Sequence, residues 1–429
     1  MGLTFSIHTL GCRANQADSE QMAQILLSAG FEEVAFGQPA DCQVVNTCTV
    51  TREADRKSAQ MVRRAARLGD QVVVTGCGAA QKGGAWQRVP STALRLPPEQ
   101  REQILEKIGA QHCPSGDRLE RNWLRRDRAR ALLRIQEGCD QFCTFCIVPY
   151  VRGRARSQSR EWVLEQVLAL GTQEVVLSGI HLSAWGQERQ EDLADLLEFL
   201  LPRTPGVRYR LSSVEPDLFP TRIFDLMVGY PERVCPHLHL VLQHASDAVL
   251  QRMHRGYDLA HYDALVQEFV TRVPGACLTT DLMVGFPGET HQDFEILMRY
   301  VRRTPFARIH VFPYSQRPGT SAARFPDQVA EAVSQQRRDR LLKLADRKRI
   351  AFQRQNLGQI REALVESESE QPGWMKATSD NFLPLLLRGG PALRGKRLLC
   401  RLQRRRGELI IAVAESGAET GTVSREEGF

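Results

Sequence analysis

The sequence predicts an α/β protein with three parts: an N-terminal open parallel α/β domain, a central partial (β/α)6 barrel, and a small antiparallel β-barrel towards the C-terminal end. Three patterns support this prediction. Strand-like and helical segments alternate over the first 77 residues, the alternation resumes at Ala131 for six strand–helix steps, and five short strand-like segments follow residue 356. We expect the parts to span residues 1–115, 131–355 and 356–417.

The first part contains apolar strands separated by helices, which is typical of a parallel sheet covered on both faces. Strands are expected at residues 5–10, 43–50 and 71–77, and helices at 17–30 and 51–69. Cys12, Cys48 and Cys77 lie at or just beyond the C-terminal ends of these strands. Ligands bind at that edge of an open parallel sheet, so three cysteines far apart in sequence can meet there.

Residues 81–130 are rich in glycine and proline and contain one expected helix, at 97–109, before a basic linker. From Ala131 the strand–helix alternation returns. Strands are expected at residues 131–139, 174–180, 207–216, 237–243, 277–287 and 307–315, each followed by a helix. Chemistry in such barrels occurs at the C-terminal ends of the strands.

A basic helix at residues 335–356 leads into the third part. Five short strands are expected there, at residues 359–369, 373–380, 382–388, 397–407 and 408–415. The polar residues from Ser416 onward are expected to lack regular structure.

Composition favours a soluble, cytoplasmic protein with an anionic partner. The N-terminal segment does not resemble a signal peptide, and no apolar stretch approaches the ~20 residues that cross a bilayer. The formal net charge is +7, and arginines cluster at residues 118–134, 152–160, 337–354 and 394–406. Each cluster alone suits a solvated helix face, whereas several together favour phosphate binding. Eleven cysteines in a reducing compartment favour metal ligation, catalysis or burial over disulfides.

The strongest chemical motif is Cys139-x-x-x-Cys143-x-x-Cys146. Three thiolates on one short loop can ligate three irons of a cubane iron–sulfur cluster, which leaves the fourth iron open to a small molecule. A zinc site is the alternative, but structural zinc ordinarily takes four protein ligands. With Phe145 before the third cysteine, this loop resembles the radical S-adenosylmethionine (SAM) superfamily.

That resemblance implies that the open iron binds SAM and that residues at later strand ends contact it. The residues expected to bind the cofactor, besides Phe145, are Gly179, His181, Ser213, Glu215, Gln243 and Gly285. A glycine-rich turn at Gly285 also allows close approach of the backbone to adenine or ribose. Ordinary strand-to-helix turns are the alternative interpretation of each of these segments alone.

The segments TLGCRANQ, VVNTCTVT and TGCGAA carry Cys12, Cys48 and Cys77. Three buried free cysteines are one interpretation. Together, however, the segments resemble the N-terminal domain of radical-SAM methylthiotransferases, in which such cysteines hold an auxiliary [4Fe-4S] cluster. The resemblance extends to a C-terminal TRAM-like RNA-binding barrel. RLSSVEP, DLMVGFPGET and FPYSQRPGTSAA are most similar to the branch that acts on N6-threonylcarbamoyladenosine 37 of tRNA.

The resemblance implies two [4Fe-4S] clusters and two SAM molecules per turnover: one SAM methylates a sulfur at the auxiliary cluster, and the other is cleaved to a 5′-deoxyadenosyl radical. No residue is assigned as an acid or base. The expected partners are the tRNA anticodon stem-loop with modified adenosine 37 and a flavodoxin or ferredoxin as electron donor, with no membrane and a monomeric enzyme.

Two alternatives stay open. LQHAS at residues 242–246 resembles the branch that methylthiolates a ribosomal-protein aspartate. The segment after Cys77 also departs from the tRNA branch, because it lacks the usual tyrosine. A zinc-stabilised, non-enzymatic RNA-binding protein is the second alternative. The remaining cysteines are interpreted as structural or incidental: Cys42, Cys113, Cys235, Cys277 and Cys400.

Overall fold

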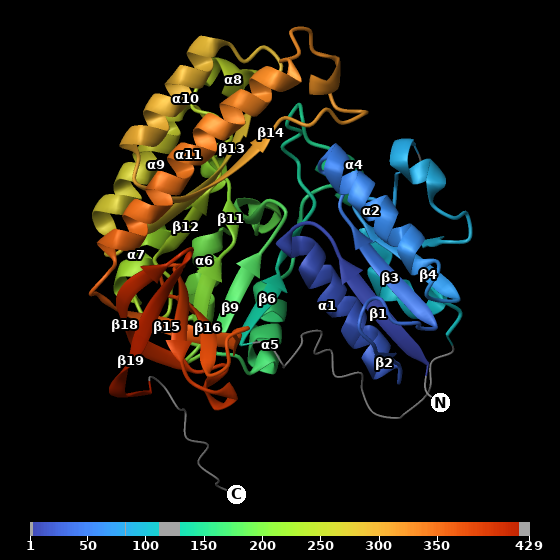
Figure 1. The fold of residues 1–429 in the computed structure, drawn as a ribbon, viewed down its shortest axis with the longest axis horizontal. Coiled ribbons are helices and arrows are strands. Elements are labelled where there is room, and N and C mark those ends of the chain that lie inside the picture. Colours follow the sequence, from blue (N-terminus) through green and yellow to red (C-terminus); the bar gives the residue numbers. More distant parts are fainter. Residues whose placement is uncertain (1–2, 82, 111–128, 420–429) are drawn as a thin grey trace, which may run out of the picture. The chain divides into compact units, whose positions relative to one another are not determined.

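The computed structural model describes residues 3–81, 83–110 and 129–419, with side chains up to Glu415. The chain divides into two compact units (Figure 1). Unit 1 comprises residues 1–125, 132–156 and 315–325, and unit 2 comprises residues 126–131, 157–314 and 326–429. The boundaries at residues 115, 131 and 356 stay a prediction, and Cys113 lies outside the described residues.

Unit 1 contains a five-stranded parallel sheet in the order β2-β1-β3-β4-β5, as the sequence predicts for an open α/β domain. The strands are β1 (Thr4–Thr9), β2 (Glu32–Glu33), β3 (Cys42–Thr47), β4 (Gln71–Gly76) and β5 (Leu94–Arg95). Successive residues of β3 and β4 face opposite sides of the sheet. Val44 and Val73 therefore pack with α1 (Arg13–Ser28), while Val45 and Val74 pack with α2 (Arg52–Ala65).

The other elements of unit 1 are short. The helix expected at residues 97–109 is instead a 3-10 segment (Pro98–Gln103) followed by a single α-helical turn, α3 (Ile104–Lys107). After residue 128 come β7 (Gln136–Glu137) and α4 (Val148–Arg152) of unit 1, and two strands that cross a unit boundary, β6 (Arg130–Arg134), which shares a sheet with β9 (Glu174–Ser178) and β10 (Arg208–Leu211), and β8 (Arg156–Ser157).

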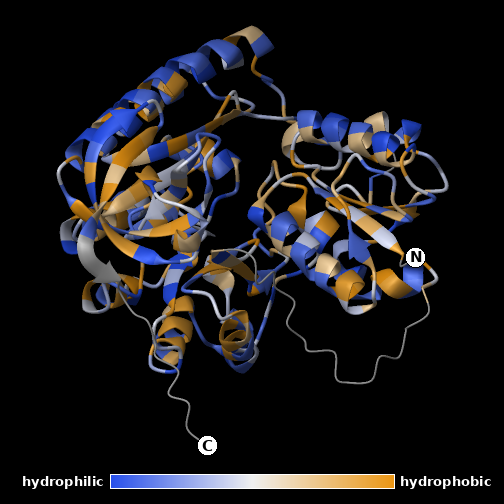
Figure 2. Ribbon diagram, turned by 60° about the horizontal axis from the view of Figure 1, so that its bottom comes forward, coloured by the Kyte–Doolittle hydropathy of each residue, from blue (hydrophilic) through white to orange (hydrophobic). Residues whose placement is uncertain are grey.

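Unit 2 contains the strands and helices of a partial (β/α) barrel, which confirms the predicted fold class. Strands β9 (Glu174–Ser178) and β10 (Arg208–Leu211) pair in parallel. Four further parallel strands form one sheet: β11 (Ser213–Val214), β12 (His237–Leu240), β13 (Cys277–Val284) and β14 (Phe306–Pro313). The helices are α5 (Arg160–Leu170), α6 (Leu193–Leu200), α7 (Arg222–Gly229), α8 (Asp247–Arg252), α9 (Leu259–Arg272) and α10 (His291–Arg303). In α10, for example, the buried residues Phe294, Leu297, Met298 and Val301 recur at helical spacing and so share one face. Figure 2 shows hydrophilic and hydrophobic residues along the helices of the chain.

The long helix α11 (Glu331–Gln355) leads into the C-terminal barrel. This barrel is closed in the order β15-β16-β17-β19-β18. Its strands are β15 (Ile360–Glu368), β16 (Trp374–Ser379), β17 (Pro384–Arg388), β18 (Arg397–Arg406) and β19 (Leu409–Glu419). The barrel is not wholly antiparallel, because β17 and β19 pair in parallel. Strand β19 also continues to Glu419, so the expected irregular structure from Ser416 is wrong for residues 416–419.

Buried ion pairs join the C-terminal barrel to the strands of unit 2. Glu362 of β15 lies 2.7 Å from Arg208 of β10 and 2.8 Å from Arg397 of β18. Arg208 is fully buried and also pairs with Glu174 of β9. Arg397 belongs to one of the clusters that suggested phosphate binding, but its guanidinium forms a buried ion pair with Glu362.

Among the described residues, no helix combines the length and apolar character needed to cross a membrane.

Candidate active site

The three N-terminal cysteines follow the ends of neighbouring parallel strands. Cys12 is the N-cap residue of α1, Cys48 follows β3, and Cys77 follows β4. Thr47 pairs with Gly76, so Cys48 and Cys77 leave adjacent strands at the same level. Burial is the main cause of the raised pKa of Cys48, and the neighbouring Cys77 and Cys12 thiols contribute to it as well. The strand placement predicted from sequence is therefore found in the structure.

Glycine at position 11 allows this close approach. Gly11 has a φ of +100°, and a Cβ added there would lie 2.8 Å from Cys48 Cβ and 3.1 Å from Cys48 Sγ. Any other residue would be strained in its backbone and would push against the Cys48 side chain. The glycine of the TLGC motif thus brings the segment that carries Cys12 against Cys48.

The Cys139–Cys146 loop presents backbone donors to its sulfurs. Gln141 N–H donates to Cys139 Sγ and Val148 N–H donates to Cys146 Sγ, both at 3.4 Å. The loop is closed by a hydrogen bond from Cys146 N–H to the Cys143 carbonyl oxygen, 3.0 Å. Backbone N–H donors stabilise thiolate sulfur. When the thiolate ligates an iron–sulfur cluster, these hydrogen bonds also influence the reduction potential of the cluster. The donor set and its surroundings therefore fit an iron–sulfur cluster.

Both cysteine sets belong to unit 1. Ile147 and Val151, which directly follow the loop, form a buried apolar cluster with Cys77. The segment 315–325 contacts residues beside both sets. Arg317 donates to Thr49, the neighbour of Cys48, at 2.7 Å, and Ala322 N–H donates to the Thr144 carbonyl oxygen at 2.8 Å. The segment 315–325 therefore contacts residues next to both cysteine sets within unit 1.

Arg152 is the buried centre of a polar network between α1 and the cysteine loop. Its side chain is fully buried, and its Nε lies 3.2 Å from Cys77 Sγ. Its remaining nitrogens donate to Asn15 Oδ1 (2.6 Å), Asp18 Oδ2 (2.9 Å) and Glu137 Oε1 (2.8 Å). The Arg152 guanidinium therefore links three parts of unit 1: helix α1, the strand before Cys139, and the Cys77 thiol.

Two further arginines complete the network. Arg134 pairs with Asp18 and lies 2.6 Å from Glu137, while Arg101 lies 3.7 Å and 3.6 Å from the same two carboxylates. Of the three guanidinium groups, that of Arg152 lies directly against Cys77 Sγ. A cationic neighbour of this kind favours a thiolate ligand.

Burial acts in the opposite direction on the free thiols. It raises the pKa of Cys48 to about 11, and it also raises the pKa of Cys77, where Arg152 opposes the effect. Metal ligation by these cysteines therefore has to displace their protons.

The sequence motifs alone did not reveal this network. Asn15 lies in TLGCRANQ, and Glu137 and Arg152 flank the cysteine loop. The signal that could have found it was the polar buried face of α1, which includes Asn15 and Asp18. Arg134 and Arg152 belong to clusters that were expected to bind phosphate. In the structure, both form ion pairs with Asp18 and Glu137 instead.

The residues expected to bind SAM are divided between the units. Phe145 lies in unit 1, and the other six lie in unit 2 at or near strand ends. The six are Gly179 after β9, His181, Ser213 in β11, Glu215, Gln243 after β12, and Gly285 after β13. Since each unit is described by itself, their joint role in SAM binding stays a prediction.

Several of these residues already have partners within unit 2. His181 Nε2 lies 3.8 Å from Asp217 Oδ1, and Glu215 forms an ion pair with Arg255. Gln243 has a φ of +67°, and its Oε1 is buried without a hydrogen-bond partner among the described residues.

Packing explains why residue 285 is glycine, and the sequence did not show this. Its N–H and that of Phe286 donate to the buried Glu289 carboxylate. A Cβ at Gly285 would collide with Ser334 of α11. The close packing of α11 against the turn therefore requires glycine at position 285. This requirement is independent of any role of the turn in cofactor binding.

The remaining described cysteines support a structural interpretation. Cys42, Cys235, Cys277 and Cys400 are buried. Cys42 lies in the core of unit 1 and Cys400 in the core of the C-terminal barrel.

A partial parallel (β/α) barrel together with a CxxxCxxC loop defines a radical SAM enzyme, and residues 133–301 match the radical SAM superfamily. Residues 4–94 match the uncharacterised protein family UPF0004. The chain belongs to the radical-SAM methylthiotransferase family. It is 35% identical to the threonylcarbamoyladenosine tRNA methylthiotransferase MtaB of Bacillus subtilis, covering 92% of each chain. It is 36% identical to the tRNA-2-methylthio-N(6)-dimethylallyladenosine synthase of Moorella thermoacetica, covering 94% of this chain and 96% of that one.

A solved structure supports the fold alone. The radical SAM methyltransferase TsrM from Kitasatospora setae superimposes with a TM-score of 0.51 at 14% identity, covering 75% of this chain and 77% of that one. Family membership makes this chain an enzyme whose cofactors are SAM and [4Fe-4S] clusters. The hypothesis of a non-enzymatic, zinc-stabilised RNA-binding protein is therefore wrong.

Proposed function

We propose that this enzyme inserts a methylthio group at carbon 2 of N6-threonylcarbamoyladenosine 37 in tRNA, with two [4Fe-4S] clusters and two SAM molecules per turnover. The observation that carries the proposal is the similarity to the Bacillus subtilis enzyme along nearly the whole length of both chains. The relative from Aquifex aeolicus with the same name, 34% identical over 85% of this chain, adds support.

Within this proposal, Cys139, Cys143 and Cys146 hold the cluster that binds SAM, and Cys12, Cys48 and Cys77 hold the auxiliary cluster. When bound, the clusters and SAM supply the radical and the methylthio group. The chain's own part is positional. Arg152 fixes the Cys77 segment against the strand before Cys139, and Arg317 fixes the segment 315–325 against Thr49.

For SAM itself we assign contacts to Phe145 and to six residues of unit 2: Gly179, His181, Ser213, Glu215, Gln243 and Gly285. The buried Oε1 of Gln243, which has no hydrogen-bond partner in the part of the chain that the structure describes, is suited to accept a hydrogen bond from a ribose hydroxyl or an amino group. We further propose a cytoplasmic, monomeric enzyme, with tRNA as substrate and a flavodoxin or ferredoxin as electron donor.

The substrate assignment predicts a selective reaction in vitro. Reconstituted enzyme, SAM and a chemical reductant are combined with anticodon stem-loops carrying either threonylcarbamoyladenosine or dimethylallyladenosine at position 37. Nucleoside mass spectrometry should show replacement of hydrogen by a methylthio group in the first RNA only. Cys48→Ala, which removes one proposed ligand of the auxiliary cluster, is the negative control.

Two outcomes would redirect the assignment. Modification of the dimethylallyl stem-loop would match the Moorella thermoacetica relative. Modification of neither RNA, with methylthiolation of a ribosomal protein supplied in place of the RNA, would favour the aspartate alternative suggested by LQHAS.

A further inference from the structure

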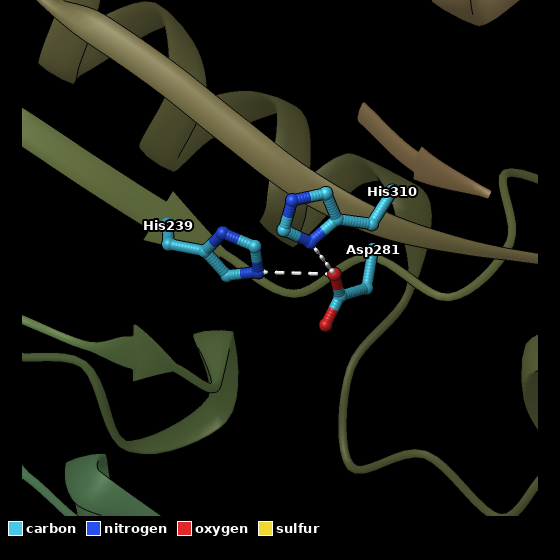
Figure 3. A group of neighbouring side chains, drawn as sticks. All are labelled: His239, Asp281 and His310. Atoms are coloured by element: carbon cyan, nitrogen blue, oxygen red, sulfur yellow. Dashed lines mark hydrogen bonds and ion pairs between the residues drawn. The ribbon is translucent and has the colours of Figure 1, made fainter. Parts of the chain in front are cut away.

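Three side chains of unit 2 converge on one point. They are His239 on β12, Asp281 on β13 and His310 on β14 (Figure 3). The three strands are neighbours in one parallel sheet, in which Asp281 pairs with His310 and Thr279 pairs with His239. The register therefore brings the three side chains together on the same face of the sheet.

The separations match those of ligands around one metal ion. Asp281 Oδ1 lies 3.2 Å from His239 Nε2 and 3.0 Å from His310 Nδ1, and the three ligand atoms all lie within 4.8 Å of one another. Ligand atoms ~2.1 Å from a metal are spaced roughly 3.0 Å apart at octahedral angles and roughly 3.4 Å apart at tetrahedral angles. A small shift of the side chains would admit an ion between them.

His239 is oriented for ligation by its own hydrogen bond. Its Nδ1 lies 2.9 Å from the Thr279 hydroxyl, which in turn lies 3.2 Å from His237 Nε2. This leaves Nε2 directed towards Asp281. Nε2 is buried and has no hydrogen bond of good geometry among the described residues. Fixing one ring nitrogen so that the other faces the ion is the usual outer support of a metal-binding histidine.

We propose that His239, Asp281 and His310 bind a divalent transition-metal ion at a site separate from the iron–sulfur cysteines. Two imidazoles and one carboxylate suit zinc, manganese, iron or cobalt, and leave coordination positions open. His310 is about half exposed, and it lines a cavity of about 430 Å³ together with Thr279 and Arg308. The exposed side of His310 therefore gives an ion a route to the site.

The site adjoins a residue of the expected SAM pocket. Gln243 N–H donates to the Asp281 carbonyl oxygen at 2.9 Å, and Met283 N–H donates to the Gln243 carbonyl oxygen at 2.7 Å. A bound ion would thus brace β12 and β13 beside Gln243. The proposal does not depend on which substrate the enzyme modifies.

Zinc binding to the reconstituted, untagged enzyme tests the site. After anaerobic dialysis against micromolar Zn²⁺, zinc and iron are both counted by elemental analysis. Wild type should bind one zinc per chain with its iron unchanged. Asp281→Asn and His310→Ala should keep their iron but bind zinc at least about tenfold more weakly. His291→Ala, at an exposed position in α10, should behave as wild type.

Zinc X-ray absorption of the wild-type protein provides a measurement independent of the variants. Nitrogen and oxygen neighbours are expected. Sulfur neighbours would assign the zinc to cysteines and overturn the proposal. Absence of zinc binding by iron-loaded wild type, or equal binding by all variants, would overturn it as well and leave a hydrogen-bonded cluster.

Discussion

A variant with alanine at Cys139, Cys143 and Cys146 is expected to lose SAM cleavage completely while keeping the auxiliary cluster. The loop supplies the three thiolates that would hold the SAM-binding cluster, and no sulfur would remain there to replace them. Iron per chain should fall from about eight to about four after anaerobic reconstitution, with acid-labile sulfide falling in parallel. Chromatography of 5′-deoxyadenosine measures the loss of cleavage.

The reciprocal variant separates the two cysteine sets. Alanine at Cys12, Cys48 and Cys77 should also retain about four irons. It should still cleave SAM but transfer no methylthio group. Cys42→Ala, a buried cysteine in the core of the same unit, should keep all its iron. If wild type binds only about four irons and the first variant none, the N-terminal cysteines hold no cluster, and the proposed mechanism fails.

Replacement of Arg152 by methionine is expected to destabilise unit 1 by about 3–5 kcal/mol. Methionine fills similar space but leaves Asp18 and Glu137 without their central buried partner. It also removes the Nε donor that lies 3.2 Å from Cys77 Sγ. Calorimetry of the reconstituted enzyme should show the midpoint of the affected transition falling by roughly 10 °C. Iron analysis should show loss of the auxiliary cluster first.

Arg154→Met is the matched control, two residues away. The Arg154 side chain is 74% exposed, and its ion pair with Asp140 lies at the surface. Exposed pairs contribute about 0–1 kcal/mol, so its midpoint should hardly change. Equal effects of the two variants would show that Arg152 has no special structural role. Retention of all iron by a destabilised Arg152→Met would show that the network supports the fold but not the cluster.

Local pattern was enough to predict the order of the elements. Apolar segments with turn residues between them identified the sheet of unit 1, the partial barrel and the five C-terminal strands, because hydrophobic periodicity is set by each segment alone. The prediction was wrong in detail for residues 97–109, which form a 3-10 segment (Pro98–Gln103) and a single α-helical turn (Ile104–Lys107) in place of one helix.

The sequence did not show which arginines of the basic clusters form ion pairs within the fold. Arg134, Arg152 and Arg397 belong to basic clusters that suggested phosphate contacts, yet all three form ion pairs within the fold, and Arg152 and Arg397 are buried. Whether an arginine meets solvent or a carboxylate depends on residues distant in the chain: Asp18 lies 134 residues from Arg152. The same holds for Gly285, whose missing side chain leaves space for Ser334 of a later helix.

The sequence by itself determined the fold class, the two cysteine sets and their position at strand ends, because each is a matter of residue type, spacing and period. Only the tertiary structure decided which polar residues surround those sets. It placed Arg152 between Cys77 and Glu137, and it brought His239, Asp281 and His310 together through strand register. Such contacts form between segments whose proximity arises only when sheets and helices pack, so no local pattern encodes them.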